Sequence, residues 1–227
     1  LEGVSPTVLV VDNASTDDTA AEVRAAGLRH PGLDVRVIRE EEKGTGAACD
    51  TGFRHAIAHG ATFILRTDAD CLPSPTWAAC MRDALAGGLD LVSGNYRART
   101  DDGTAPFGAS VTVPLVYGMV RLVGRIRPNN NRKGEGYQGP YVLTPGGNMG
   151  IRAAAYLKSG GFPRTKIEEA HEDKLIVNRV RKVSSKLGYR RDAIVRFSNR
   201  RAARNGIVNN LRWYLNHGGG SAVVDVR

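Results

Sequence analysis

Short apolar stretches alternate with helix-forming stretches over the first 93 residues of the chain. The strand-like stretches are residues 7–11, 35–39, 62–67 and 89–93, and the helix-forming ones are residues 20–26, 47–59 and 76–85. This alternation is typical of βαβ units, and it predicts an α/β fold with a mostly parallel central sheet flanked by helices. Ligands of such sheets bind at the carboxyl ends of the strands, so those ends are where a site is expected.

An acidic pair follows the third strand-like stretch. The segment 64–70 reads ILRTDAD, so Asp68 and Asp70 are two residues apart and point to the same side of an extended backbone. Neighbouring carboxylates repel each other unless they share a proton or a cation, and Mg²⁺ and Mn²⁺ prefer oxygen ligands. The alternative is an Asp-rich turn, because Asp favours turns and Pro73 and Pro75 come soon after.

The first strand-like stretch also ends in polar residues. Asp12 and Asn13 follow the buried apolar run TVLVV, and the segment continues with residues that form turns and cap helices, Ser15 among them. Because the carboxyl ends of parallel strands meet at one edge of a sheet, Asp12 and the Asp68–Asp70 pair are expected near each other. This shared location favours a binding site more than either motif does alone.

The length of 227 residues suits one large globular domain or two small ones; 41% of the residues are hydrophobic, and no apolar run is near the roughly 20 residues of a membrane span. The opening residues do not resemble a signal peptide. Three scattered cysteines are too few for a disulfide framework, so the expected location is cytoplasmic. Residues 1–120 hold 10 Lys/Arg and 16 Asp/Glu, whereas residues 121–213 hold 21 and 6. The basic part favours phosphorylated ligands, an anionic membrane face or nucleic acid, and an Arg-rich solvated surface explains the charge equally well.

The second half is predicted to contain helices at residues 151–159, 170–187 and 205–216 and a late strand at 190–197. Residues 109–123 are apolar and predict a helix bent at Pro114. Arg125 and Arg127 follow it, so the helix could rest on a membrane surface. A buried helix is the preferred interpretation of the same residues.

Several motifs in a fixed order resemble the inverting glycosyltransferases of family 2, which share the Rossmann-like GT-A fold. They are VLVVDNASTDDT at 8–19, KGTGAACDTGFRHA at 43–56, TDAD at 67–70, GGNMGIR at 146–152, SGGF at 159–162 and HEDKLIVNR at 171–179. The resemblance covers residues 8–197 and is far more specific than any single motif. It implies one GT-A domain over 1–227, with a nucleotide-binding half at 1–94 and an acceptor and catalytic-base half at 95–227.

The resemblance implies transfer of a sugar from a UDP-, GDP- or dTDP-sugar to an acceptor hydroxyl. Residues 111–123 with Arg125 and Arg127 could fit a lipid-linked or anionic acceptor at the inner face of the membrane. Asp70 with Asp68 would bind Mn²⁺ or Mg²⁺, and Asp173 beside Glu172 would be the general base. The other implied residues are Asp12, Asn13, Ser15, Lys43, Gly44, Gly46 and Arg179 for the donor and His217 as a further metal ligand.

Each of these roles has a structural alternative. Glu172 and Asp173 could complement a helix N-terminus, and Arg179 could be an ion-pair partner within the fold. Gly44 and Gly46 could belong to a plain flexible loop. A lone His217 is more often a surface or core residue than a ligand.

The chain departs from the family pattern at three places. The opening strand of the VVIPAYNE type is absent, which would leave an unpaired strand edge in the sheet. Asn13 stands where Asp is frequent, and Cys49 stands where many members have Arg. Three other functions therefore remain open: a catalytically silent GT-A-like scaffold or fragment, a sugar-phosphate nucleotidyltransferase, and a basic nucleic-acid-binding protein. No nucleic-acid recognition motif supports the last.

Overall fold

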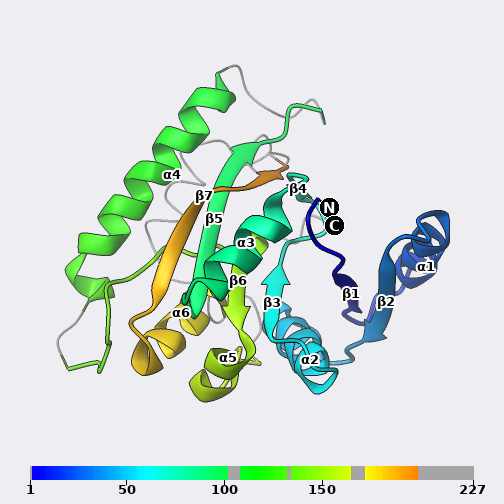
Figure 1. Ribbon diagram of the computed structural model, residues 1–227, viewed down its shortest axis with the longest axis horizontal. Helices are drawn as coiled ribbons and strands as arrows, with labels where there is room; N and C mark the ends of the chain where they lie inside the picture. Colours follow the sequence, from blue (N-terminus) through cyan, green and yellow to red (C-terminus); the bar gives the residue numbers. More distant parts are fainter. Residues whose placement is uncertain (1, 102–107, 132–133, 165–171, 199–227) are drawn as a thin grey trace.

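The computed structural model describes residues 2–101, 108–131, 134–164 and 172–198, and it has a five-stranded sheet, a separate two-stranded sheet and flanking helices (Figure 1). The strands are β1 (Thr7–Asp12), β2 (Asp34–Arg39), β3 (Phe63–Arg66), β4 (Leu72–Pro73), β5 (Leu91–Ala98), β6 (Met149–Arg152) and β7 (Leu187–Phe197). The helices are α1 (Thr19–Arg29), α2 (Thr45–Ala58), α3 (Trp77–Ala86), α4 (Ala109–Ile126), α5 (Ala153–Ser159) and α6 (Glu172–Val183), with 3-10 turns at Pro128–Asn130 and Gly146–Asn148.

The central sheet is mixed, whereas the sequence predicted a mostly parallel one. Its order is β3-β6-β5-β7-β4, and only β5 and β7 are parallel neighbours. β6 runs antiparallel to both β3 and β5, which it separates, and β4 runs antiparallel to β7. The predicted helix at 151–159 is therefore wrong at its start, because residues 149–152 form a strand and the helix begins at Ala153.

The core lies on both faces of this sheet because strand residues alternate between them. In β5, Leu91 packs with the cluster formed by α2, α5 and α6, whereas Val92 packs with the cluster formed by α3. Tyr117 of α4 packs against the second cluster, where its ring stacks on Tyr96 at a centroid distance of 5.3 Å. Phe197 contacts both rings edge-on. These three aromatic side chains attach α4 to the sheet.

β1 and β2 form a parallel pair beside the central sheet. Among the described residues β1 pairs only with β2, and β3 pairs only with β6, so each has an edge without a strand partner. Figure 1 shows β1 on the side of β3 that β6 does not occupy. The expected unpaired strand edge is therefore present. It lies between β1 and β3, which both belong to the predicted nucleotide-binding half.

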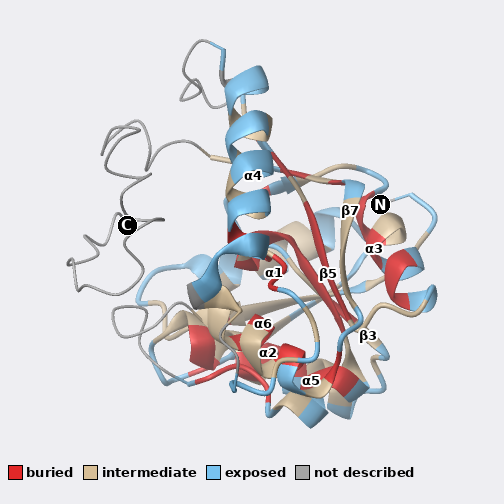
Figure 2. Ribbon diagram, turned by 90° about the vertical axis from the view of Figure 1, so that its left-hand side faces the viewer, coloured by how far each residue is buried: buried red, intermediate tan, exposed pale blue. Residues whose placement is uncertain are grey.

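α4 is not the buried helix that the sequence analysis preferred. Figure 2 shows its outer side as exposed along most of its length. The side chain of Leu115 is 67% exposed and that of Ile126 is 68% exposed, in contrast to Gly124, which is buried. No helix in the described part of the chain is long and apolar enough to cross a membrane.

Candidate active site

The predicted acidic pair lies directly after the end of β3. Asp68 and Asp70 are exposed and the following Cys71 is buried. One potential ligand atom from each of these three side chains lies within 4.8 Å of the other two. The turn is closed by a 3.0 Å bond from the Cys71 amide to the Asp68 carbonyl oxygen, and Arg99 donates to the Asp70 carbonyl oxygen at 3.2 Å. Two carboxylates this close together suit a hard divalent cation.

Cys71 differs chemically from its two acidic neighbours. Burial raises the pKa of the Cys71 thiol to about 12, and the negative charges of Asp68 and Asp70 act in the same direction. A protonated thiol is a poor ligand, and sulfur suits softer metals than Mg²⁺ or Mn²⁺. The side chains that fit a hard divalent cation here are therefore Asp68 and Asp70.

Arg66, the last residue of β3, joins the acidic pair to α6. Its Nη2 lies 3.4 Å from Asp68 Oδ1 and 3.1 Å from Glu172 Oε1, although Glu172 is 106 positions away in the sequence. The side chains of Arg66 and Glu172 are only 10% and 15% exposed. Burial acts to lower the pKa of Arg66, but the nearby acidic groups of Cys49, Asp68 and Glu172 outweigh it and raise that pKa. The contacts place the first turn of α6 beside the end of β3.

Gly146 and Gly147 form the wall of the site next to this arginine. A methyl group on Gly146 would lie 2.6 Å from the Arg66 guanidinium, and one on Gly147 would lie 2.7 Å from Asp68 Oδ2 and 2.8 Å from the hydroxyl of Tyr96. A larger residue at either position would have to displace these side-chain ends, so the two glycines allow the backbone to approach them closely. Tyr96 is thereby identified as a neighbour of the acidic pair.

The start of α6 holds the second predicted acidic pair. Glu172 is engaged by Arg66, and the Asp173 Oδ1 accepts a 2.6 Å bond from the Lys174 amide. Burial raises the pKa of the Tyr141 hydroxyl, and the charge of Asp173 raises it further, which places Asp173 near that ring. Asp173 directly follows Glu172 in the first turn of α6.

The end of β1 is built around two polar side chains. Asp12 is buried; its Oδ1 accepts a 3.0 Å bond from the Ser15 amide, and its Oδ2 pairs with Arg39 at 3.1 Å. The bonds from Ser15 and the charge of Arg39 lower the pKa of Asp12. The Asn13 amide donates to the carbonyl oxygens of Glu40 and Glu42 at 3.2 and 2.7 Å. These bonds tie the loop after β1 to the loop after β2.

The loop after β2 leads into α2 through the predicted glycines. Asn13 Oδ1 accepts a 2.8 Å bond from the Gly44 amide, and Gly44 has φ 146°, a value that L side chains rarely adopt. Gly46 is buried in the first turn of α2, and Lys43 is exposed. No side chain caps the N-terminus of α2. The loop therefore presents a lysine and backbone amides, and it has the shape of an ordered turn.

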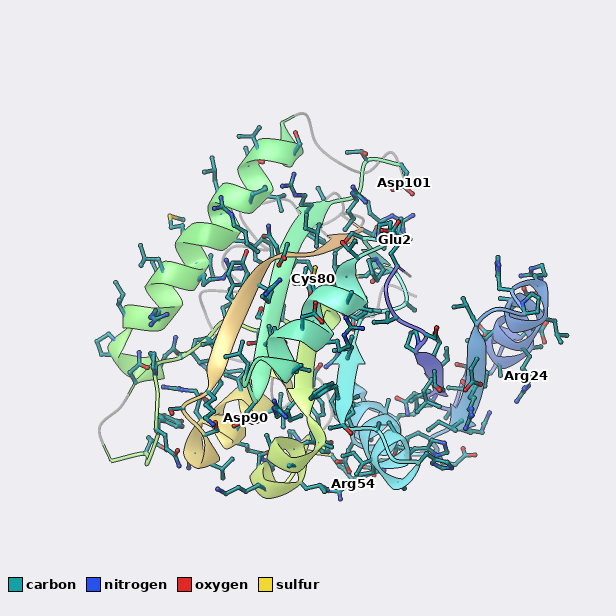
Figure 3. The ribbon with its side chains drawn as sticks, in the orientation of Figure 1. Glu2, Arg24, Arg54, Cys80, Asp90 and Asp101 are labelled. Atoms are coloured by element: carbon teal, nitrogen blue, oxygen red, sulfur yellow. The ribbon has the colours of Figure 1, made fainter. Side chains whose placement is uncertain are left out.

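A second charged cluster, which the sequence analysis did not identify, lies behind this loop. Arg164 bonds to Glu40 at 2.9 Å and to Glu42 at 2.8 Å, and it lies 3.6 Å from Asp50. Asp50 also pairs with Arg54 of α2, which is labelled in Figure 3. Arg164 is more than 110 positions from each of these acids, so nothing local in the sequence indicates the contacts.

The structure does not place the other two predicted residues, Arg179 and His217, at the acidic pair. Arg179 donates a 2.7 Å bond to the Gly161 carbonyl oxygen, so its guanidinium is used to fix the turn after α5. His217 lies outside the described residues, as does the predicted helix at 205–216. Arg66 was overlooked because the sequence shows it only as one residue of the strand that precedes the acidic pair.

Comparison with known proteins places this geometry in context. Residues 6–156 match the family described as Glycosyl transferase family 2. Over 89 residues the chain is 35% identical to Glycosyltransferase AglE of Haloferax volcanii, covering 39% of this chain and 28% of that protein. Over 88 residues it is 32% identical to polyprenol monophosphomannose synthase of Mycolicibacterium smegmatis, covering 39% of this chain and 33% of that protein. The chain thus matches about a third or less of each relative's length.

A solved structure supports the fold. It is the mannosyltransferase PcManGT from Pyrobaculum calidifontis, in complex with GDP-Man and Mn²⁺. The TM-score is 0.60 at 22% sequence identity, and the match covers 95% of this chain and 56% of that one. This likeness confirms the predicted GT-A fold.

Proposed function

The chain belongs to glycosyl transferase family 2, and on that premise we propose that it moves a sugar from a nucleoside-diphosphate sugar to an acceptor hydroxyl with inversion at the anomeric carbon. The observation that carries the proposal is the chain of contacts from Asp68 through Arg66 to Glu172. It brings the carboxylate pair after β3 close to the acidic first turn of α6, although the two are far apart in the sequence. Leaving-group stabilisation and proton removal need two such groups around one substrate.

The leaving diphosphate would be held at the acidic pair. Asp70 and Asp68 would bind Mn²⁺ or Mg²⁺, and the bound cation would supply the positive charge that neutralises the departing diphosphate. Lys43 would contribute positive charge and Gly46 a backbone amide at the uncapped start of α2, while Gly44, whose amide bonds to Asn13, would shape the loop. These contacts are stronger for a departing diphosphate than for the intact donor, so they lower the barrier to bond cleavage.

The acceptor hydroxyl would lose its proton to Asp173. A carboxylate oxygen of Asp173 takes the proton while the hydroxyl oxygen attacks the anomeric carbon from the face opposite the diphosphate, which inverts that centre. Glu172 and Arg66 hold the first turn of α6 in place and so position Asp173. A positioned general base typically contributes about 10²–10⁴-fold in rate.

The nucleoside would be bound at the end of β1. Asp12 and Ser15 shape the turn, and Asn13 connects it to the glycine loop through both its donor and its acceptor. Arg179 is best assigned the structural role, because it already bonds to the Gly161 carbonyl oxygen.

Two variants and one control test this proposal with the same preparation of protein. Thermal stability is measured with GDP-, UDP- and dTDP-sugars, each with Mn²⁺, Mg²⁺ or EDTA, and nucleoside diphosphate release is then measured with acceptor present. Asp70→Asn should lose the metal-dependent stabilisation by donor. Asp173→Asn should keep it and lose transfer by about 10²–10⁴-fold. Asp83→Asn, in an exposed ion pair on α3, should match the parent in both measurements.

The outcomes separate the alternatives. Transfer by Asp173→Asn at the parent rate would show that another group is the base. Donor stabilisation that is equal in EDTA and in Mn²⁺ would remove the metal from the proposal. Stabilisation by no nucleotide sugar would favour the catalytically silent scaffold.

A further inference from the structure

α4 carries an extended apolar surface that no described part of the protein covers. Seven large apolar residues between Val111 and Ile126 have exposed fractions from 39% to 68%. They are Val111, Leu115, Val116, Met119, Leu122, Val123 and Ile126. Single exposed apolar residues are ordinary on a protein surface, but a continuous apolar surface of this kind marks an interaction site.

These side chains form one stripe along the helix. At about 100° of rotation per residue, the seven positions fall within an arc of about 140°, and Thr112 is the only polar residue inside that arc. The opposite side of α4, which includes Tyr117 and the buried Gly124, faces the protein. α4 is therefore apolar on both sides, a pattern found in helices that are covered by protein or by lipid.

Every charged residue of α4 and its C-cap is an arginine. Arg125 and Arg127 are exposed and border the arc on its two sides, and Arg121 lies next to Arg125 one helical turn earlier. The sequence has no Asp or Glu from residue 108 to residue 134. An apolar helix face bordered only by arginines is complementary to a membrane interface that contains anionic lipid.

The arginines also border a shallow recess at the edge of α4. Arg121, Arg125, Tyr141 and Tyr189 are among the residues lining a cavity of about 60 Å³. The Arg121 guanidinium lies 3.3 Å from the centroid of the Tyr189 ring, and Arg121 Nε is buried without a hydrogen-bond partner. The recess therefore places positive charge beside α4.

We propose that α4 is an interfacial helix, which lies in the plane of an anionic lipid bilayer with its apolar stripe in the acyl boundary and its arginines among the head groups. The helix cannot span the membrane, so it would bind from one side. A second copy of the chain is a poorer occupant of the stripe. Pairing two α4 faces would bring arginines together with no acidic residue on either face to neutralise them.

Vesicle flotation with the full chain tests this inference. Vesicles of phosphatidylcholine alone are compared with vesicles that contain about one-third phosphatidylglycerol, without any donor sugar, so the result does not depend on the proposed transfer. The parent should float with the anionic vesicles. The triple variant Leu115→Gln/Leu122→Gln/Ile126→Gln, which changes exposed side chains only, should bind at least about tenfold more weakly. Arg125→Gln/Arg127→Gln should lose about fivefold per arginine on anionic vesicles.

A matched control lies elsewhere on the surface. Leu28→Gln changes a leucine of α1 that is even more exposed, and it should bind vesicles like the parent. Equal binding by the parent and the triple variant would overturn the proposal, as would no binding of the parent to either vesicle. A parent that is dimeric and becomes monomeric in the triple variant, with no vesicle binding, would assign the stripe to a second copy instead.

Discussion

Replacing Arg66 with Met tests the contact on which the architecture of the site depends. The substitution keeps most of the apolar stem and removes the charge, so the Glu172 carboxylate is left 85% buried without its partner. Removing one partner of a buried ion pair typically costs about 3–5 kcal/mol. Because Glu172 keeps some access to water, the lower end of that range, about 3 kcal/mol, is expected. For a domain of this size the melting temperature should then fall by roughly 6–12 °C.

Urea unfolding followed by circular dichroism measures this loss. The double variant Arg66→Met/Glu172→Gln should be more stable than Arg66→Met alone, because it no longer buries an unpaired charge. Arg36→Met provides the matched control, since Arg36 pairs with Asp34 on the surface with both side chains about half exposed, and it should lower the stability far less than Arg66→Met does. The reasoning is refuted if Arg66→Met stays within about 0.5 kcal/mol of the parent or if the double variant is no better than the single one.

Three other predictions concern the surroundings of the site. The hydroxyl of Thr51 and the guanidinium of Arg164 lower the pKa of Glu40 to about 2, so the stability that Glu40 provides is present above about pH 4.5 and is lost as the pH falls towards 2. Glu40→Gln should therefore be less stable than the parent by roughly 1 kcal/mol in urea unfolding at pH 7, and equal loss at pH 2.5 would contradict this assignment. Gly147→Ala should weaken metal-dependent donor binding in the thermal assay, because its methyl group would crowd the carboxylate that is expected to bind the cation. Cys49 is partly buried and its thiol pKa is raised to about 11, so it should react with iodoacetamide at pH 8 at least about tenfold more slowly in the native protein than in urea, and equal rates would contradict this assignment.

Local sequence signals predicted much of the fold. The alternation of strands and helices, the acidic pair after residue 66 and the acidic start of α6 are all determined by neighbours in the chain, and all three are present. The expected mostly parallel sheet was wrong because β6 runs antiparallel to β3 and β5, and β4 runs antiparallel to β7. The segment MGIRAAAYLKS has helix-forming residues directly after a four-residue strand, and only its pairing with β3 and β5 distinguishes the two.

Contacts between distant residues could not be predicted in this way. Arg66 and Glu172 meet only because β3 and α6 are packed together, and Arg164 reaches Glu40 across a similar separation. The exposure of α4 was also missed. Apolar composition is the same for a helix that is covered on all sides and for one that is covered on one side, so the sequence favoured a buried helix until the packing of Tyr117 fixed which side faces the protein.

The stacked rings of Tyr117 and Tyr96 have one more consequence. Tyr117 belongs to α4, and the Tyr96 hydroxyl borders the same glycine as the Asp68 carboxylate. A surface that binds the exposed side of α4 would therefore also restrict the motion of the acidic pair, because two closely packed aromatic side chains connect them. Release of α4 from the surface that it binds would then also make the Asp68–Asp70 pair less rigid, and binding of the leaving group would become weaker.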